Sequence, residues 1–178
     1  WGIALSPDGR RIALTLLTDQ GTDIWIKTLP NGPVSRLTLD SARDVAPAWT
    51  PDGRAVTFLS DRPISPDSTR RAGRFALWQQ AADGTDQPRL LWSRNAAATY
   101  GFVSPDGRWT ILGAGSPRSA NTHDILAAHA GEDTISRAIV ASGVDEEGAT
   151  LSPDSRWLAY VSNEQGEYEV FVRPFPNM

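Results

Sequence analysis

The sequence contains no cysteine, so the chain can form neither a disulfide bond nor a thiolate metal site. It also lacks a run of about 18 consecutive apolar residues, the length that a membrane-spanning helix needs. No basic segment followed by an apolar one, the pattern of a targeting signal, is present. Because the chain begins at Trp1 instead of Met, we expect it to be a section of a longer protein.

Lysine is nearly absent too, since 16 of the 17 basic residues are arginine. The arginines are scattered among 21 acidic residues, and the formal net charge of the 178 residues is −4. This distribution lacks the concentrated basic surface that nucleic-acid binding requires. With 40% hydrophobic residues and seven tryptophans, the composition is typical of a folded globular domain that does not bind nucleic acid.

A five-residue motif occurs four times, and each copy precedes an apolar run. It reads Ser-Pro-Asp-Gly-Arg at 6–10 and 104–108, Thr-Pro-Asp-Gly-Arg at 50–54, and Ser-Pro-Asp-Ser-Arg at 152–156. The prolines, at positions 7, 51, 105 and 153, are 44, 54 and 48 residues apart. Repeats of this length are the signature of a β-propeller, in which each unit of four strands forms one blade.

The motif itself has the chemistry of a tight hairpin turn. Proline presets φ, aspartate can accept bonds from the local backbone, and glycine tolerates positive φ. Because the motif holds the same place in every unit, we interpret its residues as structural and not as an active site. They are Pro7, Asp8, Gly9, Pro51, Asp52, Gly53, Pro105, Asp106, Gly107, Pro153 and Asp154.

The segments around each motif predict the strands of a blade. The runs after the turns are almost continuously apolar, which indicates strands covered on both faces: 12–17, 56–59, 109–112 and 157–161. Third strands are expected at 23–26, 75–78, 123–126 and 168–172, and outer strands at 34–39, 89–92 and 137–140. We assign the strand tryptophans to packing between blades: Trp25, Trp49, Trp78, Trp109 and Trp157.

The sequence therefore predicts an all-β fold, a β-propeller of four consecutive blades. The blades span 1–45, 46–98, 99–146 and 147–178, and the fourth lacks its outer strand. Propellers usually close with about four to eight blades. We expect an arc of a larger ring of six or more blades, and four blades that close on themselves are the alternative.

A candidate partner-binding loop interrupts the second blade. The 54-residue spacing indicates an insertion over 61–74, which carries Arg62, Arg70, Arg71 and Arg74. Four guanidinium groups on one loop can bind carboxylates or phosphates through paired hydrogen bonds. The alternative is a solvated loop whose charge only aids solubility.

Catalytic and metal sites are not predicted. The segment 113–117 is the nearest approach to a nucleophile elbow and does not match Gly-x-Ser-x-Gly. His123, Asp124 and His129 could bind zinc, but Asp124 occupies the place that Asp23 fills before the third strand of the first blade, which favours a feature of the repeat. We interpret the acidic run 145–147 as a solvated turn, because no calcium-loop pattern surrounds it. The chain is thus expected to be non-catalytic, with no cofactor and no metal.

Two stretches carry a resemblance to a known family. Leu-Ser-Pro-Asp-Gly-Arg-Arg-Ile-Ala at 5–13 and Ala-Trp-Thr-Pro-Asp-Gly-Arg at 48–54 resemble the Pro-Asp repeats of TolB-like propellers. The last stretch, 151–176, is similar to propellers at the carboxyl ends of bacterial serine/threonine protein kinases. The chain itself has none of the kinase motifs.

The resemblance implies a protein-interaction or sensing module with a protein partner, and it favours a periplasmic or other extracytoplasmic location. It carries no catalytic residue onto this chain. The alternative is the gating propeller of a prolyl-oligopeptidase-like serine peptidase whose hydrolase domain lies elsewhere.

Overall fold

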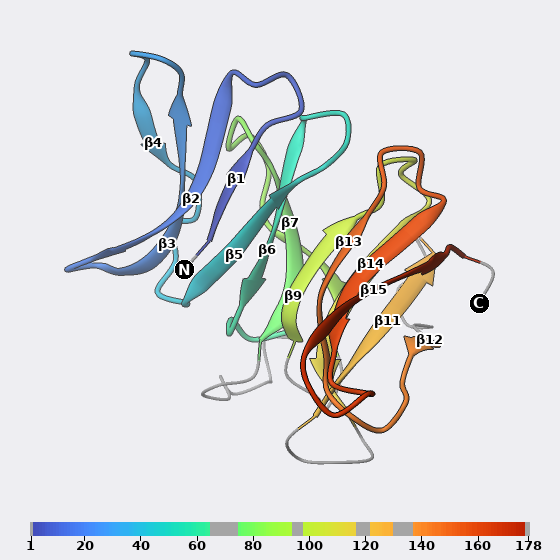
Figure 1. Cartoon of the computed structure of the whole chain (residues 1–178). Coiled ribbons are helices and arrows are strands. Elements are labelled where there is room, and N and C mark those ends of the chain that lie inside the picture. The colour runs from blue at the N-terminus through green and yellow to red at the C-terminus, as the bar shows by residue number, and fades with distance from the viewer. Residues whose placement is uncertain (1, 65–74, 94–97, 117–121, 130–136, 177–178) are drawn as a thin grey trace.

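The computed structural model describes residues 2–64, 75–93, 98–116, 122–129 and 137–176. In these ranges fifteen strands form four antiparallel sheets, and no residue is helical. Figure 1 shows the sheets arranged in chain order, with the blue first sheet farthest from the orange and red ones. Within the described ranges no helix is long and apolar enough to span a membrane.

The first two blades each contain four strands in sequential order. Blade 1 consists of β1 (Ile3–Leu5), β2 (Arg11–Thr18), β3 (Gly21–Thr28) and β4 (Val34–Arg36). Blade 2 consists of β5 (Asp44–Trp49), β6 (Ala55–Ser60), β7 (Ala76–Ala81) and β8 (Arg89–Trp92). The strand β4 is shorter than predicted because the chain leaves the ladder before Thr38. There the Ile24 amide donates to the hydroxyl oxygen of Thr38.

The last two blades differ in strand number. Blade 3 consists of β9 (Ala98–Val103), β10 (Trp109–Gly115), β11 (His123–His129) and β12 (Arg137–Val140). Blade 4 has β13 (Glu146–Leu151), β14 (Trp157–Ser162) and β15 (Glu169–Pro174), with no fourth strand in the described part of the chain. The predicted all-β fold of four consecutive blades, the last without its outer strand, is confirmed.

The repeated motif forms the turn between the first and second strand of every blade. In blade 2 the Thr50 hydroxyl donates to Asp52 Oδ1 at 2.7 Å, and the Arg54 amide donates to the same oxygen at 3.0 Å. Gly53 has φ +66°, a conformation that glycine adopts without strain. Ser155 takes the corresponding place in blade 4 with φ 55°.

Burial of the second strands depends on the position of the blade. Every residue of β6 is buried, and so are the central residues of β10, because these strands lie in the middle blades with a sheet on each side. In contrast, burial alternates along β14. Trp157, expected to pack between blades, is 47% exposed, because no further sheet of the described residues covers this face of blade 4.

Apolar cores fill the spaces between successive sheets. Ile24 and Ile26 of blade 1 pack with Val56 and Phe58 of blade 2. A second core joins blades 2 and 3, and a third contains Leu158 of blade 4 with residues of blade 3. The blades are therefore stacked face to face through side chains, the packing that a propeller requires.

Candidate binding site between the second and third blades

Beside the turn of blade 2, the interface between blades 1 and 2 is filled by one long side chain. Arg11, the first residue of β2, donates from Nη2 to the carbonyl oxygen of Gly53 at 2.6 Å. Its guanidinium carbon lies 4.5 Å from the ring centroid of Trp49, the last residue of β5. Trp49 Nε1 in turn donates to the carbonyl oxygen of Ala4 at 3.0 Å.

The interface between blades 3 and 4 is closed in a similar way by an aromatic side chain. Trp109, the first residue of β10, lies with its ring centroid 3.9 Å from that of His129 and 5.5 Å from that of Phe175. The turns of the two blades also touch, since the Asp106 amide donates to Ser155 Oγ at 3.1 Å.

Between blades 2 and 3 both of these space-filling positions hold small residues. Ala55 begins β6, where Arg11 and Trp109 begin their strands, and Val103 ends β9, as Trp49 ends β5. The turns are apart as well: no described atom lies within 4 Å of where a Cβ of Gly107 would be. The result is a cleft of about 560 Å³ between the two blades.

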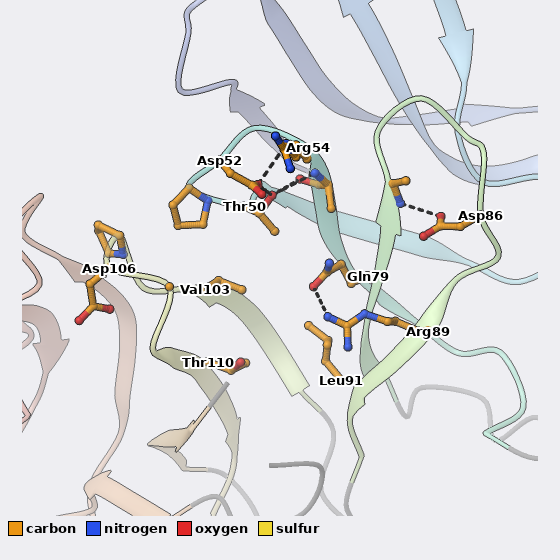
Figure 2. Close-up of a pocket in the computed structure, with 15 residues that line it drawn as sticks. Thr50, Asp52, Arg54, Gln79, Asp86, Arg89, Leu91, Val103, Asp106 and Thr110 are labelled. Carbon is orange, nitrogen blue, oxygen red and sulfur yellow. Dashed lines mark hydrogen bonds between the residues drawn. The ribbon is translucent and has the colours of Figure 1, made fainter. Parts of the chain in front are cut away.

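Three walls surround this interblade cleft. Figure 2 shows Thr50 and Asp52 on one side and Val103 with Thr110 on another. The third wall comes from Gln79 of β7 and from Arg89 and Leu91 of β8, the last two strands of blade 2. The cleft thus combines apolar surface with charged groups, the composition of a site that binds by contact and orients by hydrogen bonds.

Carboxylates outnumber guanidinium groups around the cleft, where Asp52, Asp86 and Asp106 accompany Arg54 and Arg89. Hydrogen bonds from the Thr50 hydroxyl and the Arg54 amide lower the pKa of Asp52. Burial acts to raise the pKa of Asp106, but hydrogen bonds from Ser104 and the amide of Arg108 outweigh it and lower that pKa. Both carboxylates are therefore ionised at neutral pH.

One of the two guanidinium groups is partly engaged within the protein. Arg89 Nη2 donates to Gln79 Oε1 at 3.1 Å, a bond drawn in Figure 2. Asp86 Oδ1 accepts a hydrogen bond from the amide of Ala81 at 2.7 Å, which holds this carboxylate at the rim. Arg89 and Asp86 are thus each held by a hydrogen bond within the protein.

Of the four arginines of the predicted binding loop, only Arg62 lies among the described residues. Its side chain is 9% exposed, and its Nη2 lies 3.0 Å from each carboxylate oxygen of Asp44 and 3.1 Å from Asp40 Oδ2. Arg62 is therefore bound within blade 2, just beyond the end of β6 that is opposite Ala55. Arg70, Arg71 and Arg74 fall outside the described residues.

Three of the residues considered for metal binding, His123, Asp145 and Glu146, make contacts within the protein. His123 Nδ1 lies 2.8 Å from Asp145 Oδ1, and Tyr168 donates to Asp145 Oδ2 at 2.9 Å. Glu146, expected in a solvated turn, is instead fully buried at the start of β13 and accepts bonds from Ser142. In the described part of the chain no three His, Cys, Asp or Glu residues are grouped to hold a metal ion.

The sequence interpreted the turn residues as structural and did not indicate the cleft that some of them border. Pro51, Asp52, Pro105, Asp106 and Gly107 all line it. The available signal was a comparison among the repeats themselves. Aligned on the motif, the residue directly after it is Arg, Ala, Trp and Trp in blades 1 to 4, and only the second of these is small.

Comparison with known proteins agrees with the architecture. The family described as the TolB beta propeller domain, PD40, matches residues 3–173. The chain belongs to this family. Two curated relatives of this TolB-like propeller are an uncharacterized protein of Agrobacterium fabrum, 31% identical over 85 residues, and the Tol-Pal system protein TolB of Anaeromyxobacter dehalogenans, 41% identical over 49 residues.

These relatives are much longer than the matched segments. The first match covers 48% of this chain and 26% of the relative, and the second covers 28% and 11%. Among solved structures, TolB from Acinetobacter baumannii has a TM-score of 0.76 at 22% identity, over 97% of this chain and 40% of that one. A prolyl endopeptidase structure has a TM-score of 0.69 at 17% identity, over 97% and 26%. At these identities the structures support the fold.

Proposed function

We propose that this TolB-like propeller is a non-catalytic protein-interaction module whose partner binds in the interblade cleft. The observation that carries the proposal is the small residue Ala55, which stands where Arg11 and Trp109 fill the flanking interfaces. Val103 likewise stands where Trp49 packs against Arg11. Because the rest of the scaffold is packed and hydrogen-bonded, the cleft is a preformed opening on a rigid frame. Preformed openings on rigid frames favour binding.

Site-specific photo-crosslinking in the full-length protein tests this function. A benzoylphenylalanine residue replaces Leu91 on the cleft wall and, as a matched control, Leu17, which is 64% exposed on blade 1. We expect a discrete protein adduct at position 91 and none at 17. The variant Ala55→Trp, which copies the Trp109 packing, should abolish that adduct. An adduct that survives a filled cleft would contradict the proposal.

A peptidase-associated propeller is the second candidate. The prolyl endopeptidase structure supports it, because its fold is similar over 97% of this chain. In that arrangement a propeller accompanies a separate hydrolase domain, which needs its own Gly-x-Ser-x-Gly elbow. Sequence downstream of residue 178 that contains such an elbow would favour the peptidase. A kinase domain and an apolar span upstream of residue 1 would favour the signalling context.

A further inference from the structure

We propose that the interblade cleft receives an arginine side chain of the partner polypeptide. This inference rests on the proposed function and specifies the chemistry of the contact. It follows from a repeat position that the protein itself fills with arginine one interface earlier. The cleft therefore borders a turn-glycine carbonyl that corresponds to the acceptor that Arg11 uses between blades 1 and 2.

The acceptor is the carbonyl group of the turn glycine. In the filled interface, Arg11 donates to the Gly53 carbonyl, and its Nη2 lies 3.7 Å from where a Cβ of Gly53 would be. Gly107 occupies the same place in the next turn with nearly the same backbone, φ +73° against +66°. Since Gly107 borders the cleft, its surroundings are open to a donor that comes from outside.

Charge complementarity favours a cation over an anion. An entering guanidinium group comes close to three lining aspartates, Asp52, Asp86 and Asp106, and the first and last of these are ionised. Arg11 also has carboxylates nearby in its own interface, because its charge helps to lower the pKa of Asp8 and of Asp83. An anion would instead be repelled by those carboxylates, and Arg89, one of the two cations available to it, already donates to Gln79.

The apolar part of the cleft wall suits the methylene groups of an arginine side chain. Leu91 and Val103 can contact these methylene groups, because long cationic side chains commonly lie along apolar surface while the charged group stays in a polar environment. The buried face of Thr110 continues this surface. A lysine would reach the carbonyl but would lack the planar fork that can bond a carbonyl and a carboxylate together.

Proton–nitrogen correlation NMR of the full chain tests the inference, with N-acetylarginine methylamide as the probe. Its matched control is N-acetylcitrulline methylamide, which has nearly the same shape without the charge. We expect the arginine probe to shift the amide resonances of Gly107 and Val103, with citrulline at least about tenfold weaker. The variant Ala55→Arg should remove the response, because its own guanidinium group fills the cleft.

A second variant supplies an internal positive control. Arg11→Ala opens the interface between blades 1 and 2, and the arginine probe should then shift Gly53 as well. A response at Gly53 without one at Gly107 would overturn the inference, as would equal binding of citrulline, acetate or N-acetylphenylalanine methylamide. If Arg11→Ala does not fold, the unchanged protein and Ala55→Arg decide. An adduct at position 91 without arginine binding would leave the proposed function intact and refute only the ligand class.

Discussion

Arg62 Nη2 lies 3.0 Å from both carboxylate oxygens of Asp44, a residue whose side chain is completely buried. The guanidinium carbon of Arg62 also lies 5.2 Å from the ring centroid of Phe58 and 5.1 Å from that of Trp78. Burial raises the pKa of Asp44, and the guanidinium group acts against that rise. We predict that Arg62→Met destabilises the protein by about 3–5 kcal/mol, because it leaves a buried carboxylate unpaired. Urea unfolding measures the loss.

Two further measurements separate the charge from the packing. The double variant Arg62→Met with Asp44→Asn should recover most of the lost stability, since no buried charge remains. Because the pKa of Asp44 rises further without Arg62, the single variant should lose more stability as pH increases through that pKa, and less in acid. A loss independent of pH and of Asp44 would instead assign the role of Arg62 to its contacts with the rings.

The sequence predicted the four blades because each depends on local signals. The turn motif and the apolar runs beside it act within one blade, so one sequence contains enough information. The role of Arg62 was not predicted, because a charged residue after a strand is typical of a solvated loop. Its burial depends on Asp44, which lies 18 residues earlier and reaches it only through the pairing of β5 with β6.

The cleft escaped prediction for a different reason. It results from the small side chain of Ala55. A small residue at the start of a strand carries no signal until the neighbouring sheet is placed against it. Trp157 is the converse case, since its size favoured packing but the described chain has no sheet on that face. Contacts between blades are thus the level that local patterns in one sequence predict least well.

A glycine pair on β10 offers a packing test with its own control. At Gly113 an added Cβ would lie 2.7 Å from Cδ1 of the Tyr100 ring, whereas at Gly115 no described atom is within 4 Å. Gly113→Ala should therefore cost about 1–3 kcal/mol in the free energy of unfolding, and Gly115→Ala should be close to neutral. Tyr100 is fixed by a 3.2 Å bond from the Ala149 amide, so its ring cannot easily move away. Equal costs for the two variants would contradict this packing.

The contact of Arg11 with Gly53 predicts different effects on stability for two substitutions at equivalent positions. Arg11→Ala removes a charge-assisted hydrogen bond and the stacking on Trp49, and should cost about 2 kcal/mol. Ala55→Arg adds the same side chain at the next interface and should leave the unfolding free energy unchanged or higher. Thermal and urea unfolding of both variants, compared with Arg11→Lys, measure these effects. A large loss in Ala55→Arg would mean that the space beside Gly107 cannot admit the side chain.

The turn aspartates predict a specific dependence of stability on pH. The Ser6 hydroxyl and the Arg10 amide lower the pKa of Asp8 below its ordinary 3.8, and the pKa of Asp52 is lowered in the same way in the next blade. A lowered folded-state pKa means that the unfolded chain binds more protons, so this stability is fully present above about pH 4 and declines as pH falls through the folded-state pKa.

Asn is the matched replacement, because its side-chain oxygen can still accept the hydroxyl bond. We expect Asp8→Asn with Asp52→Asn to flatten the acid limb of a urea-midpoint curve measured from about pH 2 to 5. The exposed Asp19 of the β2–β3 turn, changed to Asn, is the control and should leave that limb as it is. An acid limb that is equally steep in the double variant would show that other carboxylates cause the pH dependence, and that the bonds within the turns add no stability of their own.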